Sequence, residues 1–233
     1  MVSLRGRAVK TFLQGYLTCN SDRIEKNAPT PMTLCNLKGR VIANGWALGD
    51  DEEVALVVHS SLAEAVGAFL KPYAMFSKIQ IQASHEPVGV IQDPAAPGVF
   101  CSPWAFADGV FAPDNATGED RSTPIAHALI DQSFAWVSAP VSGKFLPQVL
   151  GMPAAGAVDF DKGCYLGQEI IARAQFRGAV KRGIDHFSFS GDTPAPGDSL
   201  EDPEHGSGTV ILTTSQAQSD RPDLRQGLWV RNL

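Results

Sequence analysis

The sequence has few cysteines, and none of them stands at the spacing of a familiar metal or redox motif. The four residues, Cys19, Cys35, Cys101 and Cys164, form no C-x-x-C pair and match neither a zinc ribbon nor a ferredoxin. This pattern argues against a structural metal site or an iron–sulfur cluster held by this chain alone, and it favours a reducing compartment. The histidines have no metal-ligand spacing either: His59, His85, His127, His186 and His205.

Long apolar runs and an excess of positive charge are also lacking. No stretch of about 18 apolar residues occurs, and no signal-peptide core follows the basic N-terminus. We therefore expect a soluble, cytoplasmic protein that makes no contact with a membrane. The formal net charge of -6 excludes a uniformly basic surface, so any contact with nucleic acid would have to use a local basic patch such as that around 173–182. We expect no direct, stable binding of nucleic acid.

The common catalytic motifs are missing as well. The sequence contains no G-x-S-x-G, H-E-x-x-H, P-loop or G-x-G-x-x-G element. These absences argue against the hydrolases, metalloproteases, nucleotidases and dinucleotide enzymes that these motifs identify.

One segment concentrates chemically useful residues, the run Lys-Gly-Cys-Tyr-Leu-Gly-Gln-Glu at positions 162–169. Gly163 and Gly167 let the backbone turn and approach a ligand closely. From Leu166 the pattern predicts a helix, with Glu169 and Arg173 spaced four apart as an ion pair. Cys164 is therefore expected in the turn that opens this helix.

The surroundings of Cys164 allow two interpretations. The positive end of the helix dipole and the nearby Lys162 favour a thiolate, and a basic run follows at Arg173, Arg177, Lys181 and Arg182. This predicts a reactive or ligating cysteine beside an anion-attracting patch. The alternative is a small buried thiol in a tight turn, because free cysteine is among the most buried residue types.

Hydrophobic patterning predicts an α+β fold in which helices pack on a largely antiparallel sheet. We expect a helix over 9–14 ending at Gly15, and a helix after 61 with Ser61 and Glu64 as a capping box and Pro72 as its limit. The expected strands are 33–37, 40–48, 54–58 and 78–82.

The second half of the chain divides into an irregular region and a β-rich end. Residues 94–124 are rich in Pro, Gly, Asp and Ala, and the pattern at 125–130 fits a helix or a strand equally well. Strands are expected at 184–190, 208–213 and 227–230. We therefore predict a first domain over 1–184, contracted at 94–124, and a small β domain over 185–233.

Four segments, in this order, resemble those of the YgfZ-type folate-binding proteins, which are relatives of the glycine-cleavage T-protein, an aminomethyltransferase. They are residues 12–18 (FLQGYLT), 35–40 (CNLKGR), 71–78 (KPYAMFSK) and 145–182, the last containing KGCYLGQE. KGCYLGQE matches a highly specific family element, and the other three segments support it.

The resemblance implies a T-protein-like α+β fold, with antiparallel sheets and packed helices around a central cleft and a small C-terminal β-barrel-like domain. Tetrahydrofolate or a derivative would bind in the cleft. It also implies an accessory protein that assembles or maintains iron–sulfur enzymes, including the methylthiolating enzymes that modify tRNA. Folate and these client enzymes are then the expected partners.

The resemblance also implies residue roles. Cys164 would be the catalytic residue, acting as a nucleophile or as a transient ligand of an iron–sulfur cluster. The implied folate contacts are Lys162, Tyr165, Gln168, Glu169, Arg173 and Trp136.

Two other functions stay open. One is a folate-dependent methyl or aminomethyl transferase. In the aminomethyltransferases that the chain resembles, the strand after the turn at Lys38-Gly39 carries a carboxylate that works at the folate, whereas this chain has Ala43 and Asn44 there, which cannot act as a general base. A non-catalytic interaction module without a ligand is suggested by the tryptophans linked to folate in the family. The chain begins too late to contain one of them, and it has Ile125 at the position of another.

Overall fold

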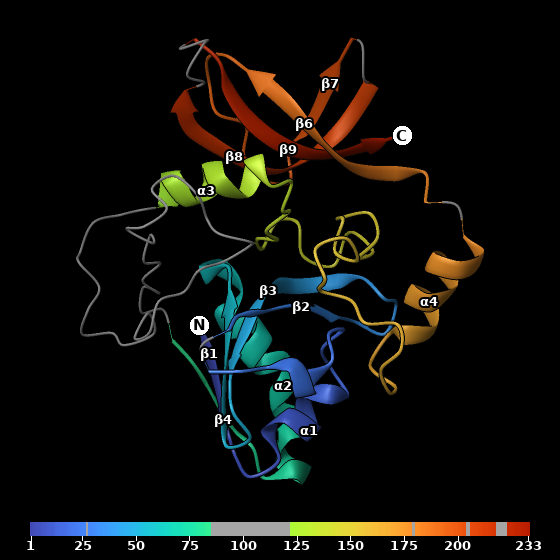
Figure 1. Ribbon diagram of the computed structural model, residues 1–233. Helices are drawn as coiled ribbons and strands as arrows, with labels where there is room; N and C mark the ends of the chain where they lie inside the picture. The colour runs from blue at the N-terminus through green and yellow to red at the C-terminus, as the bar shows by residue number, and fades with distance from the viewer. Residues whose placement is uncertain (27, 85–121, 179, 204–205, 218–222) are drawn as a thin grey trace.

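The computed structural model describes residues 1–26, 28–84, 122–178, 180–203, 206–217 and 223–233 (Figure 1). Most of the irregular region expected at 94–124 lies outside these residues, as do Cys101, His85 and His205. The described chain forms two antiparallel sheets with helices packed against them, which confirms the predicted α+β class.

The first sheet has five strands in the order β2-β3-β4-β1-β5, and every neighbouring pair is antiparallel. The predicted meander is confirmed as β2, β3 and β4. Sequence reasoning missed β1, which lies between β4 and β5 and pairs Val2 with both Leu56 and Ala83. The strands are β1 (Val2–Arg5), β2 (Thr30–Cys35), β3 (Val41–Gly49), β4 (Glu53–Val58) and β5 (Gln80–Ala83).

Helix α1 (Val9–Gln14) has the predicted bounds and ends at Gly15, with Phe12 and Leu13 buried. Helix α2 (Ala63–Ser77) contacts β5 and β1 and buries Val66 and Leu70. Both helices lie against the first sheet in the lower half of Figure 1. Together they close the apolar core of this part of the molecule.

Two details predicted for α2 are wrong. The helix continues through Pro72 to Ser77, because the carbonyl that loses its partner belongs to the exposed Ala68, where water can bind it. Ser61 does not cap α2. Its hydroxyl lies 2.8 Å from Nδ1 of His59 and accepts from the amide of Ala139 at 3.0 Å, so it joins distant segments instead.

The second sheet is antiparallel, has four strands in the order β6-β9-β8-β7, and curls strongly (Figure 1). It confirms the barrel-like C-terminal region, although the short strand β7 was not predicted. Its strands are β6 (Arg182–Phe189), β7 (Ser199–Asp202), β8 (Gly206–Ala217) and β9 (Arg225–Asn232).

The ambiguous segment around residue 125 is a helix, α3 (Ser122–Asp131), and it packs on β8 and β9 (Figure 1). Ser133, just beyond α3, lies 2.8 Å from Nε2 of His186 in β6. The second sheet is thus covered by residues that precede it in the chain. The expected domain boundary at 184/185 and the expected central cleft stay predictions.

Candidate functional site

Lys162 at the start of the central segment is buried, with only 8% of its surface exposed. Its Nζ donates to the carbonyl oxygens of Gln14 (2.8 Å), Leu17 (2.7 Å) and Cys19 (2.8 Å). An ammonium has three N–H donors, so these contacts use all of them. Burial lowers the pKa of Lys162 to about 8. Lys162 therefore fixes the central segment to the chain after α1, and it has no N–H left for a ligand.

Tyr165 is buried directly beside this lysine. The Lys162 ammonium lies 5.0 Å from the centroid of its ring, and burial raises the pKa of Tyr165 to about 12. Its hydroxyl has no hydrogen-bond partner among the described residues. The next amide, that of Leu166, donates to Gly15 at 3.0 Å, so this part of the segment packs on the end of α1.

The two glycines of the segment differ in what surrounds them. Gly167 has φ +81°, and a Cβ added there would lie 2.5 Å from the carbonyl oxygen of Asn36. Asn36 belongs to the turn between β2 and β3, where its side chain accepts from the amides of Lys38 and Arg40. Gly167 therefore permits a close approach within the chain. A Cβ on Gly163 would meet nothing within 4 Å.

Cys164 lies between these structural positions and is exposed. This excludes the interpretation of Cys164 as a buried thiol. Cys19 and Cys35 are buried, and burial raises the pKa of Cys19 to about 11 and that of Cys35 further. Among the described cysteines, Cys164 is therefore the one placed to react with a molecule in solution.

Helix α4 (Gln168–Arg177) follows Cys164 and begins two residues later than predicted, after Gly167. Ile171 is buried, and its carbonyl accepts from Nε2 of Gln148 at 2.8 Å. Glu169 and Arg173 are both exposed. In the described part of the chain they form no ion pair with each other, contrary to the expectation from their spacing.

Trp136 lies in a second aromatic group, formed with Trp46, Phe134 and His59. Its ring meets Trp46 edge-on at 5.6 Å and His59 at 5.7 Å, while Trp46 stacks on Phe134 at 5.0 Å. Nε1 of Trp136 and the hydroxyl of Ser138 are buried and lack a hydrogen-bond partner in the described chain.

Asn44 holds the segment that carries Trp136, a role that sequence reasoning missed. It is fully buried in β3, accepts from the amide of Val137 at 2.8 Å and donates to the carbonyl of Ala135 at 2.8 Å. Its Nδ2 also lies 3.2 Å from the sulfur of Met152. No feature of the sequence indicated this contact, because the partners lie more than 90 residues away.

The residues present are compatible with a pterin, although only in part. A pterin needs an aromatic wall and a few polar anchors, and the partly exposed ring of Trp136 with the two unpartnered polar atoms provides these types of group, whereas Trp46 and Phe134 are buried behind it. Lys162 does not fit as an anchor for an anionic folate tail, because its ammonium is saturated. Among the described residues, no group of three or more His, Cys, Asp or Glu is placed to hold a metal ion.

The known proteins that are similar to this chain in sequence share one name. No family model matches the sequence. The tRNA-modifying protein YgfZ of Cronobacter sakazakii is 27% identical over 238 residues, which cover 86% of this chain and 72% of that protein. The YgfZ protein of Photobacterium profundum is 28% identical over 239 residues, covering 86% of this chain and 71% of its own length.

The fold has a solved counterpart. Aminomethyltransferase T of the glycine cleavage system from Bartonella henselae superposes with a TM-score of 0.62, at 12% identity, over 99% of this chain and 75% of that protein. No described helix is long and apolar enough to cross a membrane. The KGCYLGQE segment and the YgfZ relatives thus agree that the chain is similar in sequence to the YgfZ-type proteins, and the solved structure shows that it shares the T-protein fold.

Proposed function

We propose that this protein is a folate-binding accessory factor for the assembly or maintenance of iron–sulfur enzymes, including methylthiolating enzymes that modify tRNA. One contrast within the central segment carries the proposal. Lys162, Tyr165 and Gly167 are each accounted for by contacts that fold the chain, whereas Cys164 is exposed. Because the residues around Cys164 hold the segment in place and the sulfur itself faces solvent, a chemical role of the sulfur explains this cysteine best.

Cys164 acts as a nucleophile or as one ligand of a cluster in transit. Protein-bound clusters are usually held by four ligands, and the described part of this chain offers one exposed cysteine and no preformed ligand group. The remaining ligands would therefore come from the client enzyme. In this proposal the cluster is cargo that passes to or from the client, and Cys164 holds it only while both proteins are in contact.

The aromatic group around Trp136 is the proposed folate contact. Trp136 is only partly buried and supplies a flat surface, and its Nε1 is a buried donor without a partner in the described chain. A reduced folate carries one-carbon units, and this chain's own contribution is to bind and orient it. Asn44 fixes the backbone on both sides of Trp136 and so sets the position of that ring.

The competing transferase function is less well supported. A general base at the position of Asn44 would need a free carboxylate, but both polar atoms of this amide are used in the core. Asn44 therefore has neither the charge nor the freedom to act on a bound substrate.

Two experiments test the proposal. The first is complementation of a bacterial strain whose own YgfZ-type protein has been deleted. Expression of the unchanged chain should restore growth of this strain, and expression of Cys164→Ala should not. Full rescue by this variant would reject the role of the sulfur. Titration of purified protein with tetrahydrofolate should quench tryptophan fluorescence, and Trp136→Phe should weaken that binding. An unchanged signal at saturating folate would favour the interaction module that has lost its ligand.

A further inference from the structure

Helix α4 has a continuous exposed face beside Cys164. Glu169, Ile170, Arg173, Phe176 and Arg177 are all exposed, and their spacing of three and four residues places them on one side of the helix. Ile171 is buried and fixes the opposite side. In Figure 1, α4 lies at the outer edge of the molecule, between the first sheet and the curled second sheet.

This face exposes large apolar side chains to solvent. Phe176 is 71% exposed and Ile170 is 42% exposed. Ile170 also packs on the turn between β2 and β3, because its Cβ lies 3.1 Å from where a Cβ of Gly39 would be. That same turn presents Leu37, which is 74% exposed. Exposed apolar residues gathered in one place are typical of a protein interaction site.

The charges on this face are also unpaired. Arg173 and Arg177 form no ion pair in the described part of the chain, although the whole protein has a net charge of -6. Arginine beside an aromatic residue is the combination enriched at the energetic centres of protein interfaces. The face is therefore complementary to a partner segment that carries acidic and apolar side chains together.

We propose that the α4 surface (Leu37, Glu169, Ile170, Arg173, Phe176 and Arg177) is the docking site for the iron–sulfur client protein, which binds through an acidic and apolar segment. The inference rests on the proposed function and deepens it. Cys164 lies four residues before α4, so a partner seated on this face lies next to the exposed thiol. In that position the client can provide the remaining ligands of the cluster, which Cys164 alone cannot.

Protein is favoured over RNA as the partner by the composition of the face. Two of its three apolar residues, Leu37 and Ile170, are aliphatic and provide no flat surface for stacking on a base. Glu169 lies one helical turn before Arg173 on the same face, where it would repel a phosphate backbone. An RNA contact is therefore the alternative outcome of the test.

The test uses full-length protein and a purified methylthiolating tRNA-modifying enzyme from the complementing host as the labelled probe. Arg173→Glu with Arg177→Glu, and separately Phe176→Ser, should weaken binding of the probe at least about tenfold. Added salt should weaken binding of the probe by the unchanged protein, but it should not weaken binding by the variant that carries Arg173→Glu with Arg177→Glu.

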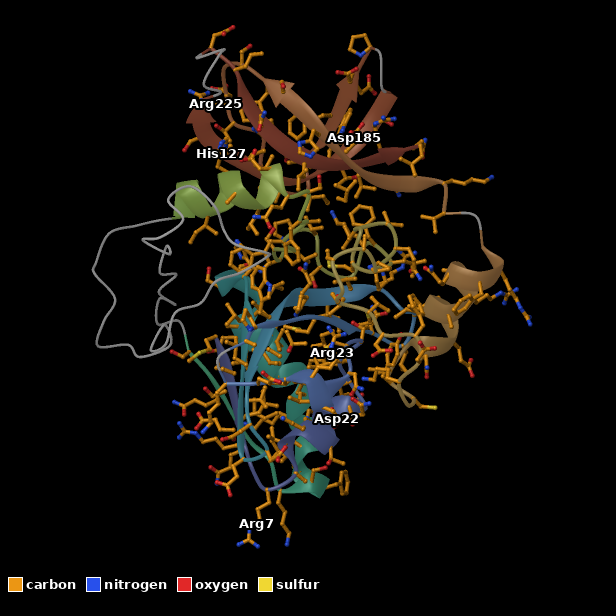
Figure 2. The ribbon with its side chains drawn as sticks, in the orientation of Figure 1. Arg7, Asp22, Arg23, His127, Asp185 and Arg225 are labelled. Carbon is orange, nitrogen blue, oxygen red and sulfur yellow. The ribbon has the colours of Figure 1, made fainter. Side chains whose placement is uncertain are left out.

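Matched controls lie elsewhere on the surface. Arg7→Glu with Lys71→Glu changes the net charge by the same amount as the double reversal, and Arg7 points away from α4 at the far end of the first sheet (Figure 2). Phe76→Ser removes a phenylalanine that is 89% exposed on α2. Both control proteins should bind the probe within about twofold of the unchanged protein, and thermal unfolding verifies that every variant is folded.

Several results would overturn the inference. These are equal binding by the α4 and control variants, no binding of the probe by the unchanged protein, or binding of labelled tRNA that the α4 variants abolish while enzyme binding persists. Complementation distinguishes a failure of this docking inference from a failure of the proposed function. If Cys164→Ala fails to complement while the α4 variants complement fully, the docking surface is rejected and the role of the sulfur stands.

Discussion

The ammonium of Lys162 donates to the carbonyl oxygen of Leu17 at 2.7 Å, across 145 positions of sequence. With the contacts to Gln14 and Cys19, this lysine connects the segment that carries Cys164 to the chain after α1. The exposed sulfur is therefore held by a buried cation that lies two residues away in sequence. This relationship leads to the first two predictions.

Lys162→Met should lower the free energy of unfolding by about 2 kcal/mol, because it leaves buried carbonyl groups without donors. Urea unfolding measures the change. Lys181→Met, at an exposed position of the basic run, is the control and should change the stability by less than about 0.5 kcal/mol. Equal stabilities for the two variants would show that the three contacts of Lys162 contribute little.

The stability difference between the unchanged protein and Lys162→Met should also depend on pH. Burial lowers the pKa of Lys162 from its ordinary value of 10.5 to about 8, so between these values the unfolded chain binds more protons than the folded one. The stability of the unchanged protein relative to the variant should therefore rise from pH 7 to pH 9.5, by roughly 1 to 2 kcal/mol. Groups that titrate alike in both proteins cancel, and a constant difference over this range would contradict the assignment.

The two glycines of the central segment should respond differently to alanine. Gly167→Ala places a Cβ at positive φ and 2.5 Å from the carbonyl oxygen of Asn36, so it should destabilise the protein by at least about 2 kcal/mol. Gly163→Ala meets open space and should leave the melting temperature nearly unchanged. If Gly163→Ala nevertheless fails to complement, the cause is the approach of a ligand or partner rather than a folding defect.

Asn44→Ala should destabilise the protein by about 2 to 3 kcal/mol, because it leaves the amide of Val137 and the carbonyl of Ala135 unpaired in the core. Release of this backbone should also change the tryptophan emission spectrum, since Trp136 lies between the two contacts. Denaturation followed by fluorescence measures both effects. Asn232→Ala, at an exposed position, serves as the control, and an equal response of both variants would argue against the role of Asn44.

Local patterns predicted much of the fold. The helix at 9–14 and the meander of β2, β3 and β4 followed from hydrophobic periodicity and turn residues, which act over short distances. The strand β1 was missed because its four residues carry too little pattern, and only its pairing with β4 and β5 defines it. The helix α2 continued past Pro72 because the one carbonyl that lost its partner belongs to the exposed Ala68, where water can bind it.

The sequence singled out the candidate segment but did not predict its arrangement, and the roles of its residues stay predictions. The segment 162–169 pointed to Cys164, and the structure places that sulfur at the surface as the sharper interpretation required. The sequence did not indicate that Lys162 faces inward, because its three acceptors come from a segment about 145 residues earlier. The hydrogen bonds of Asn44 to Ala135 and Val137 could not be predicted either, because these residues come close to Asn44 only in the folded chain.

The most direct test of the central claim is the amount of methylthiolated nucleoside in tRNA from a strain that lacks its own family protein. Cells that express the unchanged chain should regain the modification, as should cells that express Cys35→Ala, provided that this variant accumulates to the same level. Cells that express Cys164→Ala should show no recovery although the variant is equally abundant and folded. Full recovery of the modified nucleoside with Cys164→Ala would contradict the claim that this exposed sulfur performs the function.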